Sequence, residues 1–213
     1  MLTANIEKLQ SEIPNNVQVV LATKYANPTD IAEISAAYPA IIFGENRVQH
    51  GQENQAANPN IQNPWHFIGH LQRNKVKKVL QNYSCIQSVD SIRLIEEINS
   101  TALKLNQTAE ILLQVDLMNQ DTKFGFTEEE AYHVSELLPN MSNLKVKGLM
   151  CMAPHTDNTK EIKKTFASTK ALYDRLKSDG LQMEILSMGM SNDYKIAIEE
   201  GSNMIRVGSI IFK

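Results

Sequence analysis

The chain has 213 residues, of which 42% are hydrophobic and 21% charged, and its formal net charge is -3 at pH 7. This balance excludes a disordered chain and gives no general attraction to nucleic acid or to an anionic membrane. No export signal opens the chain and no apolar run is long enough to span a membrane, so we expect a cytoplasmic protein with a single domain over residues 1–213. Cys85 and Cys151 lie in apolar runs without metal-ligand spacing, which predicts buried free thiols and no metal site.

Short apolar runs alternate with amphipathic segments along the whole chain. The predicted strands are residues 17–23, 40–43, 65–68, 85–89, 111–116, 146–152, 183–188 and 204–207. The predicted helices are residues 1–14, 29–38, 47–57, 71–81, 91–105, 127–138, 158–178 and 192–200. This alternation indicates an α/β fold, a single (β/α)8 barrel of the TIM type, with a doubly wound open sheet as the alternative.

The first apolar run is followed at once by Lys24. In parallel α/β folds, ligands bind at the carboxyl ends of the strands, where loops and helix N-termini gather. A lysine held there against apolar walls loses hydration, which favours the neutral amine that attacks a carbonyl. The sequence therefore offers Lys24 for Schiff-base chemistry, against the simpler alternative of a surface lysine that closes a strand.

Glycine and serine residues follow the last two predicted strands. Gly189 and Ser191 come after the seventh strand, and Gly208 and Ser209 come after the eighth. Glycines let backbone N–H groups approach an anion, serine hydroxyls add donors, and these two loops are the usual phosphate site of (β/α)8 barrels. The loops predict a phosphate site, although tight turns and helix caps use the same residue types.

Polar residues inside or beside other strands need partners. Arg206 lies within the eighth apolar run, where a structural carboxylate, a heteroaromatic nitrogen or a ligand oxygen would each offset the cost of burial. His66 is expected to be a hydrogen-bonded core residue. Of Glu45 and Asn46, we expect one to cap the next helix and the other to face the rim of the barrel.

Further polar and flexible residues near the strand ends have simpler interpretations. A solvated helix face, rather than a nucleic-acid patch, is predicted for Arg73, Lys75, Lys77 and Lys78. Core packing, with contact to a flat ligand as the alternative, is predicted for Met150, Met152, Met188 and Met190. The loop over residues 116–125 is more typical of a solvated segment than of a ligand cover; it carries Asp121, Lys123 and Gly125.

Two predicted features lie on the same rim of the barrel: a lysine that can attack a carbonyl, and a phosphate site. Together they define the class of ligand. The ligand is an aldehyde or ketone that carries a phosphate. A phosphosugar would make the protein a class I aldolase. Pyridoxal 5′-phosphate (PLP) is the other candidate, and its ring nitrogen would give Arg206 a partner.

Six motifs follow one another from the first predicted strand to the last. They are residues 22–24 (ATK), 43–49 (FGENRVQ), 65–75 (WHFIGHLQRNK), 148–152 (GLMCM), 187–191 (SMGMS) and 206–209 (RVGS). Together they resemble the YggS/PROSC family of pyridoxal phosphate homeostasis proteins, and the resemblance covers essentially the whole chain.

The resemblance implies a barrel similar to the N-terminal domain of alanine racemase, with PLP bound as a Schiff base. It also implies a role for each matching residue: Lys24 forms the Schiff base, Ser191, Gly208 and Ser209 hold the phosphate, Arg206 faces the pyridine nitrogen, and Asn46 lines the pocket near the ring. An arginine at that nitrogen disfavours its protonation, so carbanion chemistry is expected to be poor.

The function that the resemblance implies is PLP homeostasis without established catalytic turnover. Bacterial alanine racemase adds a tyrosine base from a second domain of its partner subunit, and no room for that domain remains after Lys213. The alternatives are an amino-acid racemase or another weak PLP enzyme, the aldolase, and a scaffold without a ligand. Family analogy adds PLP-dependent apoenzymes as partners, and a monomer is expected.

Overall fold

Eight parallel strands close into a barrel in the order β1 to β8. The computed structural model describes residues 2–118 and 124–213, so the predicted loop residues Asp121 and Lys123 lie outside the described part. The strands are β1 (Gln18–Ala22), β2 (Ile42–Glu45), β3 (Trp65–Phe67), β4 (Cys85–Val89), β5 (Ala109–Val115), β6 (Leu144–Cys151), β7 (Ile185–Met190) and β8 (Met204–Val207). Since β1 pairs in parallel with β8, from Gln18 opposite Met204 to Leu21 opposite Val207, the barrel is confirmed and the open sheet is wrong.

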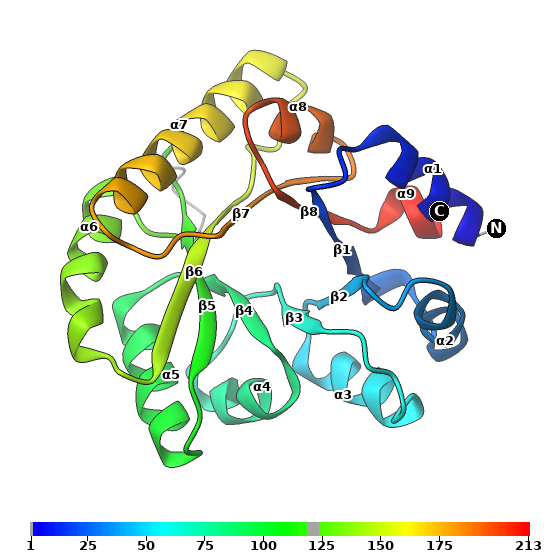
Figure 1. Cartoon of the computed structure of the whole chain (residues 1–213), viewed down its shortest axis with the longest axis horizontal. Coiled ribbons are helices and arrows are strands. Elements are labelled where there is room, and N and C mark those ends of the chain that lie inside the picture. The colour runs from blue at the N-terminus through cyan, green and yellow to red at the C-terminus, as the bar shows by residue number, and fades with distance from the viewer. Residues whose placement is uncertain (1, 119–123) are drawn as a thin grey trace.

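Helices surround the barrel on its outer side (Figure 1). The α-helices are α1 (Leu2–Glu12), α2 (Pro28–Ala37), α3 (Val48–Ala57), α4 (Val76–Asn82), α5 (Ile92–Lys104), α6 (Glu128–Leu137), α7 (Thr159–Ser178), α8 (Tyr194–Glu199) and α9 (Ser209–Phe212). Short 3-10 turns are η1 (Thr23–Tyr25), η2 (Arg73–Lys75) and η3 (Leu138–Asn140). None of the described helices is both long enough and apolar enough to cross a membrane.

Local sequence signals explain most of these boundaries. Asn27 and Thr127 begin α2 and α6 with capping boxes, in which each side chain accepts a hydrogen bond from the third backbone N–H of the helix. The predicted helix over 71–81 begins later, because η2 forms a separate tight turn before α4. The four-residue helix α9 was not predicted, since so short a segment shows no helical periodicity.

The apolar core has an outer layer and an inner layer. Outward-facing strand residues such as Leu21 and Phe43 pack against the helices. Inside the barrel, one cluster contains Val20, Ile42 and Met204, and another contains Cys85, Leu112 and Met150. Alternation along each strand then places further inward-facing side chains nearer the carboxyl ends. Several of these are polar, and they form the floor of the site described next.

Candidate functional site

A cavity of about 600 Å³ opens at the carboxyl ends of the strands. Its lining includes the six side chains or backbone segments predicted from the sequence: Lys24, Asn46, Ser191, Arg206, Gly208 and Ser209. Its volume falls in the usual range for small-molecule sites, about 300 to 1,000 Å³. The fold therefore brings together residues from the first, second, seventh and eighth strand ends at one place.

Lys24 lies in η1, immediately after β1. Thr23, which precedes it, is fully buried, and its hydroxyl donates to Glu45 Oε2 at 2.6 Å and to the Gly44 carbonyl at 3.1 Å. The Lys24 side chain itself is exposed, with its Nζ 4.9 Å from the centre of the Tyr25 ring. The expectation that apolar walls desolvate this lysine is wrong, because the 3-10 turn carries it past the strand end to the open rim.

Glu45 is a buried carboxylate that fixes this rim. It is the last residue of β2 and only 1% exposed. Its Oε1 accepts hydrogen bonds from the backbone N–H groups of Asn46 at 2.7 Å and Arg47 at 2.9 Å, while its Oε2 lies 2.7 Å from His50 Nδ1. Glu45 thus satisfies N–H groups of the two residues before α3, but neither Glu45 nor Asn46 caps that helix, so the expected cap is wrong. Asn46 lines the cavity.

Arg206 lies at the bottom of the cavity with its charge almost completely buried. Its Nη1 donates to the Ser187 carbonyl at 2.8 Å and to Ser187 Oγ at 2.7 Å, and its Nη2 donates to the Cys151 carbonyl at 2.8 Å. Burial lowers the pKa of Arg206, but a guanidinium remains protonated at neutral pH. These described partners are neutral, so the carboxylate considered from the sequence is not among them. They use three of the five guanidinium N–H groups.

The hydrogen bonds continue from Arg206 across the inside of the barrel. Ser187 Oγ donates to Gln87 Oε1 at 2.7 Å, and Gln87 Nε2 lies 2.8 Å from His66 Nδ1. Burial lowers the pKa of His66 to about 4, so its ring is neutral at pH 7 and Nδ1 accepts from Gln87. His66 is a hydrogen-bonded core residue, as predicted. Gln87 and Ser187 were missed, although a polar residue inside an apolar strand is a signal for such a network.

The segments after β7 and β8 meet at the other side of the cavity. The Gly208 N–H donates to Ser191 Oγ at 3.2 Å. A Cβ on Gly208 would lie 3.3 Å from Ala22 Cβ and 3.7 Å from Tyr25 Cδ2, so this glycine lies against the end of β1 and the start of η1. The first N–H groups of α9, at Ser209 and Ile210, have no acceptor within the helix and can serve an anion.

Gly189 has a structural role and does not line the cavity. It lies within β7 with a φ of +93°, and a Cβ there would come within 2.6 Å of Ala197 Cβ on α8. The predicted part of Gly189 in the phosphate site is therefore wrong. The positive φ and the close approach of α8 explain why glycine is needed at this position.

Comparison with known proteins identifies the family. Residues 1–213 match the family model described as "Alanine racemase, N-terminal domain". The chain is 36% identical over 216 residues to the "Pyridoxal phosphate homeostasis protein" of Helicobacter pylori (strain ATCC 700392 / 26695), with 100% of this chain and 95% of the relative covered. The chain belongs to the family of pyridoxal phosphate homeostasis proteins.

Solved structures agree with this assignment. PipY of Synechococcus elongatus PCC7942, a COG0325 family member, is 31% identical and covers 100% of both chains, with a TM-score of 0.95 without PLP and 0.91 with PLP bound. An alanine racemase from Clostridium difficile 630 is 17% identical with a TM-score of 0.81, and the match covers 99% of this chain and 55% of the racemase. The second likeness shows the barrel fold alone.

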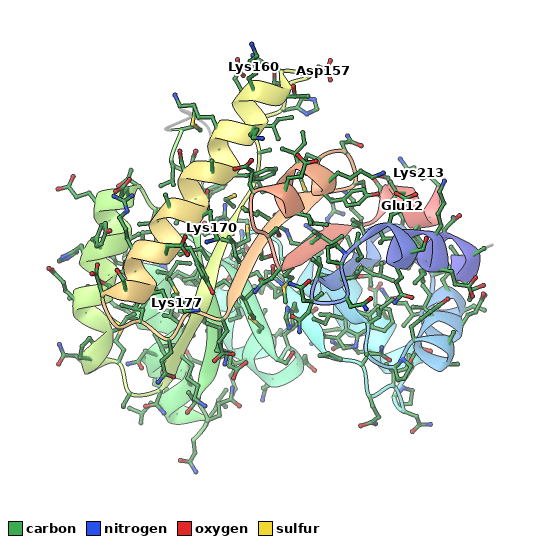
Figure 2. All side chains as sticks on the ribbon, turned by 45° about the horizontal axis from the view of Figure 1, so that its top comes forward. Glu12, Asp157, Lys160, Lys170, Lys177 and Lys213 are labelled. Carbon is green, nitrogen blue, oxygen red and sulfur yellow. The ribbon has the colours of Figure 1, made fainter. Side chains whose placement is uncertain are left out.

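Tyr25 is a further cavity residue that the sequence predictions missed. Its ring, 43% exposed, lies between the ammonium groups of Lys24, at 4.9 Å, and Lys213, at 4.6 Å. These two charges lower the pKa of the Tyr25 phenol, with Lys24 contributing most. Figure 2 shows Lys213 at the end of α9 and Asp157, another cavity residue, at the start of α7. The sequence signal that could have identified Tyr25 as a cavity residue is its position next to Lys24.

The four methionines divide between core and cavity. Met150 and Met188 are buried, whereas Met152 and Met190 are 39% and 37% exposed and line the cavity. Core packing is thus confirmed for the first pair. The second pair offers polarizable apolar surface to a flat ligand, which is the alternative considered from the sequence.

Proposed function

We propose that this protein binds PLP reversibly and covalently through the Lys24 amine and helps to control the concentration of the free cofactor. The observation that carries the proposal is the shared cavity, which places Lys24 at the rim, Arg206 at the bottom, and Ser191, Gly208 and Ser209 at one side. A 31% identical relative, PipY, has been solved with PLP bound, and relatives over the full chain are named for PLP homeostasis.

The donors in the cavity fit the chemistry of PLP. Arg206 retains two guanidinium N–H groups beyond its three hydrogen bonds, and these suit an acceptor such as a pyridine nitrogen. Ser191, Gly208 and Ser209 offer hydroxyl and backbone donors that suit a phosphate. Asn46 and the exposed methionine surface would adjoin the ring.

The same residues support a carrier rather than an efficient enzyme. When bound, PLP supplies an electrophilic aldehyde carbon and a ring that can withdraw electrons. Lys24 supplies the amine that attaches to that carbon. A protonated arginine beside the ring nitrogen disfavours protonation of that nitrogen and weakens electron withdrawal. We therefore favour reversible storage over racemase chemistry, with PLP-dependent apoenzymes as proposed recipients.

Borohydride trapping tests the attachment. Purified protein incubated with PLP should turn yellow, and reduction followed by peptide mapping should place the cofactor on Lys24. Lys24→Ala should abolish both signals. Lys213→Ala, which removes the other lysine beside Tyr25, should keep both. Protein that stays colourless, or a label on another lysine, would contradict the proposal. Trapping of a sugar phosphate without yellow colour would instead support the aldolase.

Solvent deuterium exchange tests the absence of efficient turnover. An amino acid incubated with the PLP-loaded protein in D2O should exchange its Cα hydrogen no faster than with the same concentration of free PLP. Exchange well above that level would make the protein a PLP enzyme. The monomer and the cytoplasmic location expected from the sequence stay predictions.

A further inference from the structure

A second cavity, of about 620 Å³, lies beside the first and is lined by the segments that follow β2 and β3, together with residues of α3 and α4. Nine of its eleven lining residues belong to the motifs over 43–49 and 65–75, which mark the resemblance to the family. Asn46 lines both cavities. Apart from Asn46, the proposed function uses none of these lining residues, so two of the most extended motifs in the chain meet at a place without an assigned role.

The lining of this second cavity concentrates positive charge in a chain whose net charge is -3. Arg47, Lys75 and Lys78 line it, and among the described residues none of the three forms an ion pair. His70 also lines it and is paired with Asp90, at 3.2 Å between Nδ1 and Oδ2. Aspartate and glutamate are absent from the described lining. The carboxylates nearby, Glu45 and Asp90, have other partners, so the three cations are available to an anion.

The fold, rather than a general density of lysines, produces this arrangement. Glu45 Oε1 accepts hydrogen bonds from the Asn46 and Arg47 N–H groups, and these fix the turn that carries Arg47. Lys75 and Lys78 are three residues apart at the start of α4, a spacing that places two side chains on the same face of a helix. Arg73 and Lys77 lie on the same segment but do not line the cavity. Lys78 is exposed and Lys75 half-buried, so the predicted solvated face agrees with the structure, and these two lysines in addition line the cavity.

The remaining lining suits a small organic molecule better than a bare ion. Val48 is half-buried and gives the cavity an apolar side chain. Phe67 and Leu71 also line it, but they are only 1% and 2% exposed and offer little surface to a ligand. Side-chain amides from Gln49, Gln52 and Gln72 add hydrogen-bonding groups. A few convergent polar groups of this kind fix the orientation of a small molecule.

We propose that the second cavity is a binding site for a small molecule that carries a phosphate group. Arg47, Lys75 and Lys78 contact the phosphate, and Val48 and the glutamine side chains contact the rest of the ligand. The proposal does not depend on PLP binding in the first cavity.

Titration with adenosine 5′-monophosphate, followed by backbone amide NMR, tests the site. The probe should shift the amides of Arg47, Gln49, His70 and Lys75 in a saturable manner, and adenosine without phosphate should bind at least about tenfold more weakly. The amides of Ser191, Gly208 and Ser209 report the first cavity separately, so the two sites are distinguished in one experiment.

Two double variants with equal loss of charge provide the decisive comparison. Lys75→Ala with Lys78→Ala should weaken binding of the probe at least about tenfold, because two direct charge-assisted contacts are lost. Arg73→Ala with Lys77→Ala removes two charges from the same segment outside the cavity and should change affinity less than about twofold. Equal losses in both variants, shifts confined to the first cavity, or no saturable shifts would each overturn the proposal.

Discussion

Arg206 is a buried cation whose hydrogen-bond partners are carbonyls and a hydroxyl. Two of its three bonds go to Ser187, whose hydroxyl in turn donates to Gln87. Neutral acceptors leave the guanidinium its positive charge. Each hydrogen bond also restricts the orientation of the planar guanidinium group. Ser187 is therefore a positioning residue for the donors that face the cavity.

Ser187→Ala tests this role at the scale of one residue. Loss of the hydroxyl removes one acceptor of Arg206 Nη1 and should weaken PLP binding about tenfold. A PLP analogue with carbon in place of the ring nitrogen should bind the variant and the wild type within about twofold, because it has no acceptor for Arg206. Titration of cofactor absorbance gives both affinities. An equal loss of affinity for PLP and for the analogue would show that Ser187 supports the structure in general and does not position Arg206.

His66 predicts a pH dependence of folding stability. Its folded-state pKa of about 4 lies below the ordinary value of 6.5, because burial penalises the charged ring. The unfolded chain therefore binds more protons between pH 6.5 and 4. The contribution of His66 to stability is complete above pH 6.5 and decreases by about 3 kcal/mol as the pH falls to 4.

Urea denaturation at several pH values measures this contribution. The difference in unfolding free energy between wild type and His66→Gln should shrink steadily from pH 6.5 to 4. Parallel curves for wild type and His66→Gln would show that His66 does not titrate in this range.

At the scale of elements, Glu45 connects the end of β1 with the beginning of α3. Its carboxylate accepts from the Thr23 hydroxyl next to Lys24 and from the backbone of Asn46 and Arg47. One buried side chain therefore holds the rim of the first cavity and one wall of the second. Because water does not reach this carboxylate, the groups around it have no alternative partner if it is removed.

Glu45→Ala should lower the unfolding free energy by about 3 kcal/mol, the usual cost of breaking a buried charged hydrogen-bond network. Glu53 is an exposed acid on α3, and Glu53→Ala should change the unfolding free energy by less than about 0.5 kcal/mol. Chemical denaturation of both variants gives the comparison. Similar unfolding free energies for Glu45→Ala and Glu53→Ala would mean that Glu45 does not stabilise the contact between the end of β1 and the beginning of α3.

At the scale of the whole molecule, pairing between β1 and β8 joins the first strand to the last. Asn5 of α1 also donates to the Ile211 carbonyl of α9 at 2.8 Å, and the two helices lie side by side in Figure 1. Contacts between the two ends of the sequence make independent unfolding of either half costly. This arrangement supports a single domain over residues 1–213.

A single domain predicts one cooperative unfolding transition. Trp65, the one tryptophan of the chain, is 7% exposed and its ring lies 5.0 Å from that of Phe43, so its fluorescence reports the packing between β2 and β3. Thermal unfolding followed by this fluorescence and by far-ultraviolet circular dichroism should give the same midpoint. Separate midpoints would indicate two folding units.

The sequence by itself determined the strands and much of the site. The apolar runs at β4 and β8 have the predicted bounds, because turn residues and β-branched side chains act locally. The rule that ligands gather at strand ends, together with the family motifs, selected six of the residues that line the first cavity, among them Lys24 and Gly208.

Only the tertiary structure decided how these segments meet. Contacts between residues distant in the sequence produce the closure of β1 on β8, the carbonyl partners of Arg206 and the second cavity. Periodicity describes which face a side chain occupies but not which side chain lies opposite, since strand register and helix packing set that. The basic residues around the start of α4 illustrate this limit of sequence-based prediction. Lys75 and Lys78 line a cavity, whereas Arg73 and Lys77 of the same segment lie outside it.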